Sequence, residues 1–286
     1  MLKKLLGIAP QIEADGSFRP SKLAMKLAVS SKTDYEPKTY QKYMGPNRRI
    51  VVLFTEQKNM TMKNGILFST GNHPVEAILP MLHLQNAGFE FEFVTPTGKP
   101  VVFEMWAMPV QDEHVINFYD RNKAQLESPK ALSTLIKEGL DPAVYAAVFV
   151  PGGHGVMLGI PEDSNVGTLL RWAHENDLFT ITLCHGPGAL LSTSLDSHPF
   201  LYEGYQMKVF PDSVDKQTPM IGYLPGHMPW MLCEKLTEFG VTIINKKSDN
   251  STCVDRRLIT GASPLAANEL GKLAVRTLLD ALEDAS

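Results

Sequence analysis

The residues best suited to covalent chemistry lie in the segment 179–191, which reads FTITLCHGPGALL. Its first five residues form a short, apolar, β-branched run that is typical of a fully buried strand. A glycine–proline turn and a helical pattern follow, so Cys184 stands at a sharp bend between a strand and a helix N-terminus. This geometry presents a nucleophile to a cleft, and the helix N-terminus lowers the thiol pKa from its free value of about 8.5. We therefore predict that Cys184 is a nucleophile, with His185 close by but directed elsewhere.

A second glycine-rich turn, in the segment 147–155, supports the catalytic interpretation of Cys184. Taken alone, a free cysteine at a strand end is more often inert packing than a catalyst. The segment AVFVPGGHG is another buried strand that ends in glycines, and Gly152 and Gly153 leave backbone N–H groups unshielded. In an open α/β sheet both turns lie at the carboxyl ends of strands, where ligands bind.

Composition limits the classes to which the chain can belong. With 286 residues, 44% of them hydrophobic, it can form one large α/β core or a core with a small appendage. A net charge of −4 gives no basic footprint, so we expect no stable nucleic-acid binding. Three widely spaced cysteines predict neither a disulfide framework nor a zinc cluster. The first ten residues imitate a signal peptide, but their apolar stretch is too short, and no run reaches membrane-spanning length. We expect a cytoplasmic protein without a membrane anchor.

Strand and helix patterns alternate along most of the chain, and this alternation predicts an α/β fold with a doubly wound, mostly parallel sheet. Residues 1–47 show little periodicity and are predicted to form an N-terminal arm that packs on the body or on a partner subunit. A polar loop is expected at 55–72, and an insertion or small subdomain with two helices at about 97–142. The expected strands are 50–54, 89–95, 147–150, 179–183, 204–210, 241–245 and 257–260; the expected helices are 73–88, 164–175, 187–195, 226–239 and 264–282.

Five longer strings carry a resemblance to a known family. They are GILFSTGNHPVEAILPMLHLQNAGFEFE, VFVPGGHG, LCHGPGALL, FPDSVDKQTP and IGYLPG. In this order they resemble the ThiJ/PfpI superfamily, and within it the HchA-type branch, described as glyoxalase III, protein deglycase and heat-inducible holding chaperone. The resemblance covers residues 48–286 and is weaker in the arm. It implies a flavodoxin-like sandwich, similar to class I glutamine amidotransferases, and a homodimer.

The same resemblance implies a set of catalytic residues around Cys184. His185 and Asp215 complete a triad-like arrangement, and Glu76 at a helix start meets the cysteine. A carboxyl group buried beside a thiol stays protonated and donates a hydrogen bond to the thiolate, because two close anions cannot both ionise cheaply. Without the resemblance, Glu76 would be a solvated helix charge, Asp215 a turn residue with Asp212 as a rival, and His185 a partner of a backbone carbonyl.

Chemistry that suits this set is attack on a small reactive aldehyde. The resemblance points to methylglyoxal and glyoxal, converted to lactate and glycolate without glutathione. The Cys184 thiolate would form a hemithioacetal, and backbone N–H groups of Gly152, Gly153 and His185 would meet the oxyanion. Either His185 or Glu76 would then move a proton between the adjacent carbons. The same adduct chemistry on glycated proteins and nucleotides would appear as deglycase activity, which free-aldehyde scavenging could mimic.

The metal site of the HchA-type branch is expected to be absent. In that branch two histidines and one carboxylate bind the metal, and the corresponding positions in this chain are Gln85, Glu90 and Asn122. Only the carboxylate is retained, and amides are poor zinc ligands. We therefore expect no metal and no other cofactor.

Three other functions remain open. A stress-induced holding chaperone, acting on unfolded proteins as a dimer, would need an exposed apolar surface, for which the cluster Phe103, Met105, Trp106 and Met108 is a candidate; packing within the subdomain is the more common role of such residues. A cysteine-based redox sensor would require an exposed thiol of low pKa at Cys184. A cysteine amidase or peptidase is the weakest alternative, because no downstream histidine–glutamate pair is evident.

Overall fold

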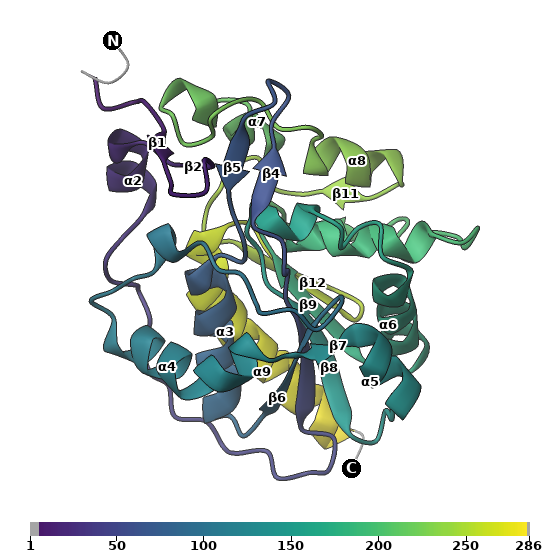
Figure 1. The fold of residues 1–286 in the computed structure, drawn as a ribbon. Coiled ribbons are helices and arrows are strands. Elements are labelled where there is room, and N and C mark those ends of the chain that lie inside the picture. The colour runs from purple at the N-terminus through teal and green to yellow at the C-terminus, as the bar shows by residue number, and fades with distance from the viewer. Residues whose placement is uncertain (1–5, 285–286) are drawn as a thin grey trace.

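A seven-stranded sheet forms the centre of the computed structural model, which describes residues 6–284 (Figure 1). The strand order is β12-β13-β9-β8-β3-β6-β7, and every neighbouring pair is parallel except the antiparallel pair β12–β13. The predicted α/β class with a mostly parallel sheet is confirmed. The strands are β3 (Arg49–Leu53), β6 (Glu90–Thr95), β7 (Lys130–Ala131), β8 (Tyr145–Val150), β9 (Phe179–Leu183), β12 (Thr252–Asp255) and β13 (Leu258–Gly261).

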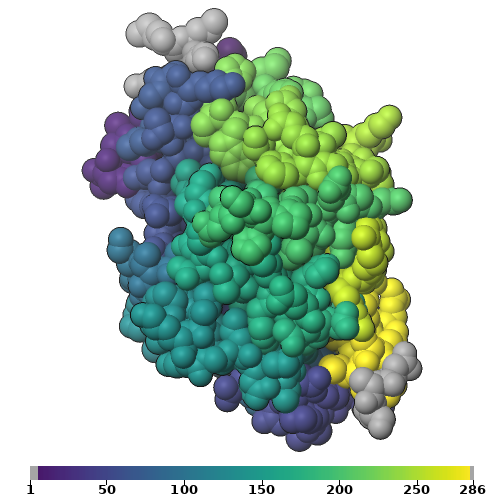
Figure 2. Space-filling model, turned by 90° about the vertical axis from the view of Figure 1, so that its right-hand side faces the viewer, coloured from purple at the N-terminus to yellow at the C-terminus, as the bar shows by residue number. Residues whose placement is uncertain are grey.

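Helices cover both faces of this sheet, which is why its strands are apolar without alternation. On one face α3 (Pro74–Asn86), α4 (Glu113–Glu127) and α9 (Ala267–Asp284) pack in one cluster with Ile50 and Val52 of β3. On the other face α5 (Leu132–Glu138) and α6 (Ser164–Glu175) pack with Val51 and Leu53. Figure 2 shows the side of the molecule at the right of Figure 1, where the middle of the chain (teal and green) forms most of the surface.

The helix that carries Glu76 begins where the sequence predicts it. His73 is the N-cap of α3, Pro74 takes the first helical position, and Glu76 lies in the first turn. Proline is favoured there because its missing N–H is one of the donors that a helix start leaves unpaired. Against α3 lies α9, at a distance that only glycine permits: a Cβ on Gly271 would meet Pro80 Cα at 2.9 Å. The first turn of α3 is thereby held over the carboxyl end of the sheet.

The prediction of a polar loop at 55–72 is wrong, because this segment forms a hairpin. Its strands β4 (Asn59–Thr61) and β5 (Leu67–Ser69) join two strands of the arm, β1 (Gln11–Ile12) and β2 (Phe18–Arg19), in a small sheet of order β1-β2-β5-β4. Strands of three residues are too short for a period-2 pattern to be recognised. Met60 and Phe68 are nevertheless fully buried, so tertiary packing stabilises the hairpin.

Residues 6–47 are only partly irregular. Besides β1 and β2 they contain α2 (Lys22–Ala28), whose N-cap Ser21 accepts a hydrogen bond from Ala24 N and donates one to Ile221 O at 2.6 Å. The insertion at 97–142 contains the two expected helices, α4 and α5, and the short turn η1 (Met105–Ala107). Of its apolar cluster, Phe103 and Met108 are buried, Trp106 is half-buried and Met105 is exposed. Phe103 and Met108 belong to the core cluster on the α3 face of the sheet, and Trp106 packs against the cluster on the other face.

Several predicted boundaries near the C-terminal half differ from the structure. The predicted helix 187–195 is a 3₁₀ helix, η3 (Gly186–Ser194), and the helix at 226–239 is the shorter α8 (Leu232–Glu238). The strands predicted at 204–210 and 241–245 shrink to β10 (Gln206–Met207) and β11 (Thr242–Ile243), which pair with each other in a separate sheet. None of the helices in residues 6–284 has the length and hydropathy needed to cross a membrane.

Candidate active site

Cys184 occupies the predicted sharp turn, directly after β9. Its φ angle is +58°, a left-handed value that is uncommon for a residue with a Cβ. The turn is held by two backbone hydrogen bonds, from Cys184 N to Gly261 O at 2.9 Å and from Phe210 N to Cys184 O at 3.0 Å. The prediction that the thiol is open to a cleft is wrong, because Cys184 is only 3% exposed. Strained backbone of this kind is found at functional sites, where the surrounding structure holds it in place.

His185 points at the cysteine, contrary to the prediction that it is directed elsewhere. Its Nδ1 lies 3.3 Å from Cys184 Sγ, and its Nε2 lies 2.8 Å from Asp215 Oδ2. Asp215 belongs to the short helix α7 (Asp212–Asp215) and is buried. The rival Asp212 plays a different role, because its carboxylate accepts hydrogen bonds from the backbone N–H groups at the start of α8. The structure thus brings the three residues of the predicted triad together.

Glu76 is buried against Cys184 and is not a solvated helix charge. Its side chain is 1% exposed, and burial raises its pKa well above the usual range. A Cβ on Gly152 would lie 2.0 Å from Glu76 Oε2 and 2.9 Å from Cys184 Cβ. The glycine at position 152 therefore leaves the space in which the carboxyl group and the cysteine meet.

The thiol pKa is raised, although the sequence predicted a lowered value. Burial is the largest cause and the adjacent Glu76 adds to it, whereas a hydrogen bond from the backbone N–H of His185 acts in the opposite direction. Burial disfavours both anions, so the pair formed by Cys184 and Glu76 keeps at least one proton between them. The short helix η3 does not offset this desolvation. His185 Nδ1, at 3.3 Å, is the ring nitrogen within hydrogen-bond distance of the thiol.

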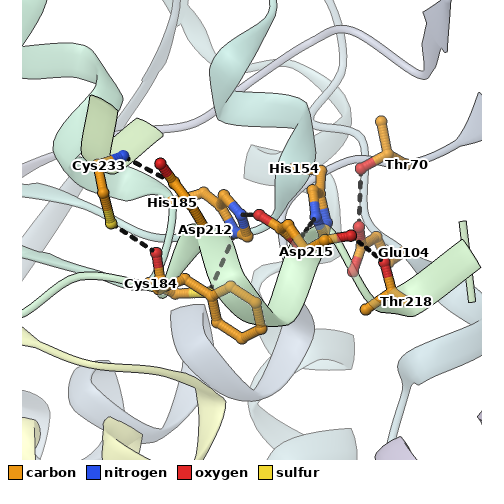
Figure 3. Close-up of polar contacts among 10 residues, drawn as sticks. Thr70, Glu104, His154, Cys184, His185, Asp212, Asp215, Thr218 and Cys233 are labelled. Carbon is orange, nitrogen blue, oxygen red and sulfur yellow. Dashed lines mark hydrogen bonds and ion pairs between the residues drawn. The ribbon is translucent and has the colours of Figure 1, made fainter. Parts of the chain in front are cut away.

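A second histidine shares the carboxylate of Asp215. His154 Nε2 lies 3.0 Å from Asp215 Oδ1, and Figure 3 shows Asp215 between His185 and His154. The centroids of the two imidazole rings are 4.0 Å apart. On the far side, buried Glu104 accepts a hydrogen bond from Thr70 Oγ1 at 2.7 Å. Sequence reasoning missed His154 and Glu104; the only available indication was that His154 stands in the glycine turn after a buried strand.

Burial and neighbouring charges shift the pKa values of this network in different directions. Burial would raise the pKa of Asp215, but the two histidines outweigh it and hold that pKa well below the usual range. Burial lowers the pKa of His154, but Asp215 and Glu104 outweigh it and the net direction is upward. Burial and the neighbouring His154 lower the pKa of His185, and the opposite effect of Asp215 does not offset them. Burial raises the pKa of Glu104 to about 7.

Unpaired polar groups face one another in this region. Among buried side-chain atoms that have no hydrogen-bond partner in the described part of the chain are His73 Nδ1, Glu76 Oε2 and Glu104 Oε2. His73 Nδ1 lies 3.9 Å from Glu76 Oε1. The backbone N–H groups of Gly152 and Gly153 also donate to no atom of residues 6–284. Buried polar groups are normally paired, so this cluster is suited to a small ligand that carries several oxygen atoms.

A cavity of about 280 Å³ leads from the surface to His73. One wall is the segment of the arm that follows α2, and another includes Val75 on α3. The half-buried rings of Trp106 and Tyr223, which do not line this cavity, pack edge to face with centroids 5.8 Å apart. The lining residues of the cavity are Ala28, Val29, Ser30, Lys32, Thr33, Asp34, His73, Val75, Ala107, Pro264 and Leu265.

The residues at the metal-site positions do not fit a zinc ion. The Glu90 carboxylate is exposed and engages Arg48 at 2.8 Å. Asn122 donates its side-chain N–H to Phe118 O at 2.8 Å, and Gln85 lines a different cavity from Glu90. Within residues 6–284, the one close group of three possible ligands is His154, His185 and Asp215, and both Nε2 atoms there are already hydrogen-bonded to the carboxylate.

The fold and this site together define a class: flavodoxin-like α/β proteins with a cysteine at the turn after a central strand. Residues 63–198 match the model of the DJ-1/PfpI family. The chain is 43% identical over 278 residues to the protein/nucleic acid deglycase HchA of Staphylococcus aureus, which covers 96% of this chain and 95% of that protein. The chain therefore belongs to the DJ-1/PfpI family.

Solved structures agree with this fold. Glyoxalase III from Candida albicans superposes with a TM-score of 0.62 at 21% identity, over 80% of this chain and 96% of that one. The Rapid Encystment Protein of Francisella tularensis gives a TM-score of 0.67 at 18% identity, over 81% and 99%. At such low identity these similarities support the architecture and not the activity.

Proposed function

We propose that this protein is a cysteine-dependent enzyme that removes reactive α-oxoaldehydes and their early adducts on proteins and nucleic acids. Two findings support the proposal: the near full-length similarity to a protein/nucleic acid deglycase, and the site geometry. The observation that carries it is the position of Cys184 between His185 and the protonated carboxyl group of Glu76. Addition to an aldehyde needs a thiol as nucleophile, a base that takes its proton and an acid that protonates the aldehyde oxygen.

The first step is addition to the aldehyde carbon of methylglyoxal. Cys184 Sγ forms the C–S bond while its proton passes to His185 Nδ1. The aldehyde oxygen becomes an oxyanion, which the backbone N–H groups of Gly152 and Gly153 stabilise until it takes the proton of Glu76 and leaves that side chain a carboxylate. The product of this step is a neutral hemithioacetal, with His185 protonated and hydrogen-bonded to Asp215.

The second step is an internal redox exchange that needs no external oxidant. A base, either the Glu76 carboxylate or His185 after it has released its proton, removes the hydrogen from the former aldehyde carbon. The hydroxyl proton of the hemithioacetal moves to the neighbouring carbonyl oxygen, and the base returns its proton to the carbon of that carbonyl. The first carbon is thereby oxidised to a thioester and the second is reduced to an alcohol. Water then cleaves the thioester, releasing lactate and restoring the Cys184 thiol.

Deglycation follows from the same first step. In a hemithioacetal or aminocarbinol adduct, the aldehyde carbon carries the sulfur or nitrogen of the modified side chain or base. Transfer of that carbon to Cys184 breaks the bond to the original thiol or amine, which leaves with a proton. The remaining steps are unchanged, so one site accounts for both activities.

Other parts of the proposal concern the setting of this chemistry. No metal or other cofactor is required by any step. The three cysteines are free, as the thiol chemistry demands, and we expect the enzyme to work in a reducing compartment such as the cytoplasm and to form a homodimer. The chaperone alternative is not favoured, since Met105 is the one exposed member of the four-residue apolar cluster. The sensor alternative requires an exposed thiol of low pKa, and it is not favoured because Cys184 is buried and its pKa is raised.

Lactate formation from methylglyoxal tests the proposal directly. Chelator-treated wild-type protein, without glutathione, is expected to produce lactate, and wild-type protein that remains inactive would reject the glyoxalase activity. Deglycation is tested by following release of free amine from methylglyoxal-modified N-acetyl-lysine. If the enzyme releases amine faster than a chemical scavenger of free aldehyde does, direct attack on the adduct is supported. If the two rates are equal, the enzyme acts only by removing free aldehyde.

A further inference from the structure

The carboxylate of Asp215 has two imidazole partners, although a triad needs only one. Both oxygen atoms are used, Oδ2 by His185 at 2.8 Å and Oδ1 by His154 at 3.0 Å (Figure 3). An ionised carboxylate only accepts hydrogen bonds, so each histidine donates its Nε2–H. For His185 this assigns the tautomer in which Nδ1 carries a lone pair, and that lone pair faces Cys184 Sγ.

His154 is placed where a positive charge is stabilised. Its side chain is 5% exposed, and the titratable groups that face it come from five separate segments: Asp215, Glu104, His73, His185 and Tyr223. Two of these are acids. The backbone N–H of His154 and the charge of its ring both lower the pKa of Glu104 against the larger effect of burial, so the two residues are close neighbours. His73 and His185 both have lowered pKa values, so neither competes for the proton.

A cationic His154 changes what Asp215 does for His185. In a simple triad the aspartate stabilises the imidazolium that forms when the histidine takes a proton. Here the negative charge is already offset by His154, whose ring centroid lies 4.0 Å from that of His185. A like charge at this distance disfavours a second imidazolium in the resting enzyme. His185 therefore stays unprotonated as the pH falls, and it remains available to accept the proton of the Cys184 thiol.

We propose that His154 is a positioning residue that stays protonated, shares Asp215 with His185 and thereby keeps His185 a free base at mildly acidic pH. This inference rests on the proposed function only for its kinetic readout. It explains why a buried histidine and a buried acid lie next to the triad. The glycine turn at 152–155 then contributes the His154 side chain as well as its backbone N–H groups.

The kinetic test is the pH profile of kcat/KM for lactate formation by wild type and His154→Gln. Glutamine still donates to Asp215 but carries no charge. We expect the acidic limb of the profile to move to higher pH by about one unit, with a smaller change at the plateau. The control is His174→Gln, a half-buried histidine that contacts Tyr205 outside this site, and its profile should match the wild type. A His154→Gln profile whose acidic limb does not move would overturn the proposal.

A second measurement needs neither a variant nor activity. Nitrogen-15 chemical shifts of the histidine rings report protonation and tautomer in the wild-type protein. At neutral pH the proposal requires an imidazolium at His154 and a neutral Nε2–H tautomer at His185. A neutral His154, or a charged His185, contradicts it. If the wild type forms no lactate, the proposed function fails, whereas these spectra still decide the state of His154.

Discussion

Replacing Gly152 by alanine tests whether catalysis depends on the contact between Glu76 and Cys184. The added Cβ would lie 2.0 Å from Glu76 Oε2, 2.6 Å from Leu183 O and 2.9 Å from Cys184 Cβ. Each distance is below the 3.0 Å that real Cβ atoms essentially never cross, so something must move. The carbonyl of Leu183 is held in the central sheet, whereas the Glu76 side chain can rotate. The carboxyl group is therefore expected to be displaced from the thiol.

Gly152→Ala is expected to lower activity more than stability. Overpacking of this kind destabilises a protein by about 1–3 kcal/mol, which a domain of this size tolerates. Loss of a positioned acid or base lowers the rate by about 10²–10⁴-fold, so kcat/KM for methylglyoxal should fall by at least about 10²-fold. Lactate formation gives the rate, and urea unfolding gives the free energy of unfolding.

A matched control lies a few residues after the cysteine. A Cβ on Gly188 would find its nearest neighbours at 3.7 Å, an ordinary contact. Gly188→Ala should therefore keep wild-type activity, although it adds the same methyl group close to the same turn. If Gly152→Ala were folded and as active as Gly188→Ala, the role assigned to the contact between Glu76 and Cys184 would be refuted.

Three further predictions follow from other contacts. Glu76→Gln removes the transferable proton and keeps the shape, so kcat/KM should fall by about 10²–10⁴-fold while circular dichroism stays unchanged. Burial lowers the pKa of His73 to about 3 from 6.5; the unfolded chain therefore binds more protons between these values, and stability is lost as the pH falls through this window. His73→Gln should weaken that loss, as measured by urea unfolding at about pH 5 and pH 7. Gly222 has φ +68° and a Cβ there would meet Ile8 O at 1.9 Å, whereas Gly204, at φ +72°, has no atom within 4 Å. Gly222→Ala should expose the arm to limited proteolysis, and Gly204→Ala should not.

Each of these predictions can fail in a recognisable way. Wild-type turnover by Glu76→Gln would show that no proton of that group moves during the reaction. An equal loss of stability on acidification in wild type and His73→Gln would assign the acid sensitivity to other groups. Equal proteolysis of the two glycine variants would mean that the positive φ angle, and not the contact with Ile8, governs the attachment of the arm.

The nucleophile and the sheet could be predicted because their determinants are local. A buried strand followed by a glycine–proline turn is visible in a dozen residues, and it placed Cys184 correctly at the bend. The alternation of patterns likewise predicted the parallel sheet. The exposure and pKa of the thiol were predicted wrongly, since they depend first on burial by the rest of the fold and then on Glu76, which reaches the site from a helix more than a hundred positions earlier in the chain.

The rest of the site is tertiary in origin. Asp215 and Glu76 came from the family resemblance, because a first-turn carboxylate is expected to be solvated until the fold buries it. The bond between His154 and Asp215 joins residues 61 positions apart, and no spacing rule connects them. The hairpin β4–β5 was missed for a similar reason: three-residue strands are stable only because the arm and the core cover Met60 and Phe68.

The most direct test of the central claim compares the three cysteines of the chain. Cys184→Ser, Cys233→Ser and Cys253→Ser are each freed of metal by chelation and assayed for lactate formation from methylglyoxal without glutathione. Catalysis through Cys184 requires that its serine variant form no lactate above the buffer rate, while the other two keep wild-type rates. Lactate production by Cys184→Ser at the wild-type rate would contradict the assignment of Cys184 as the nucleophile.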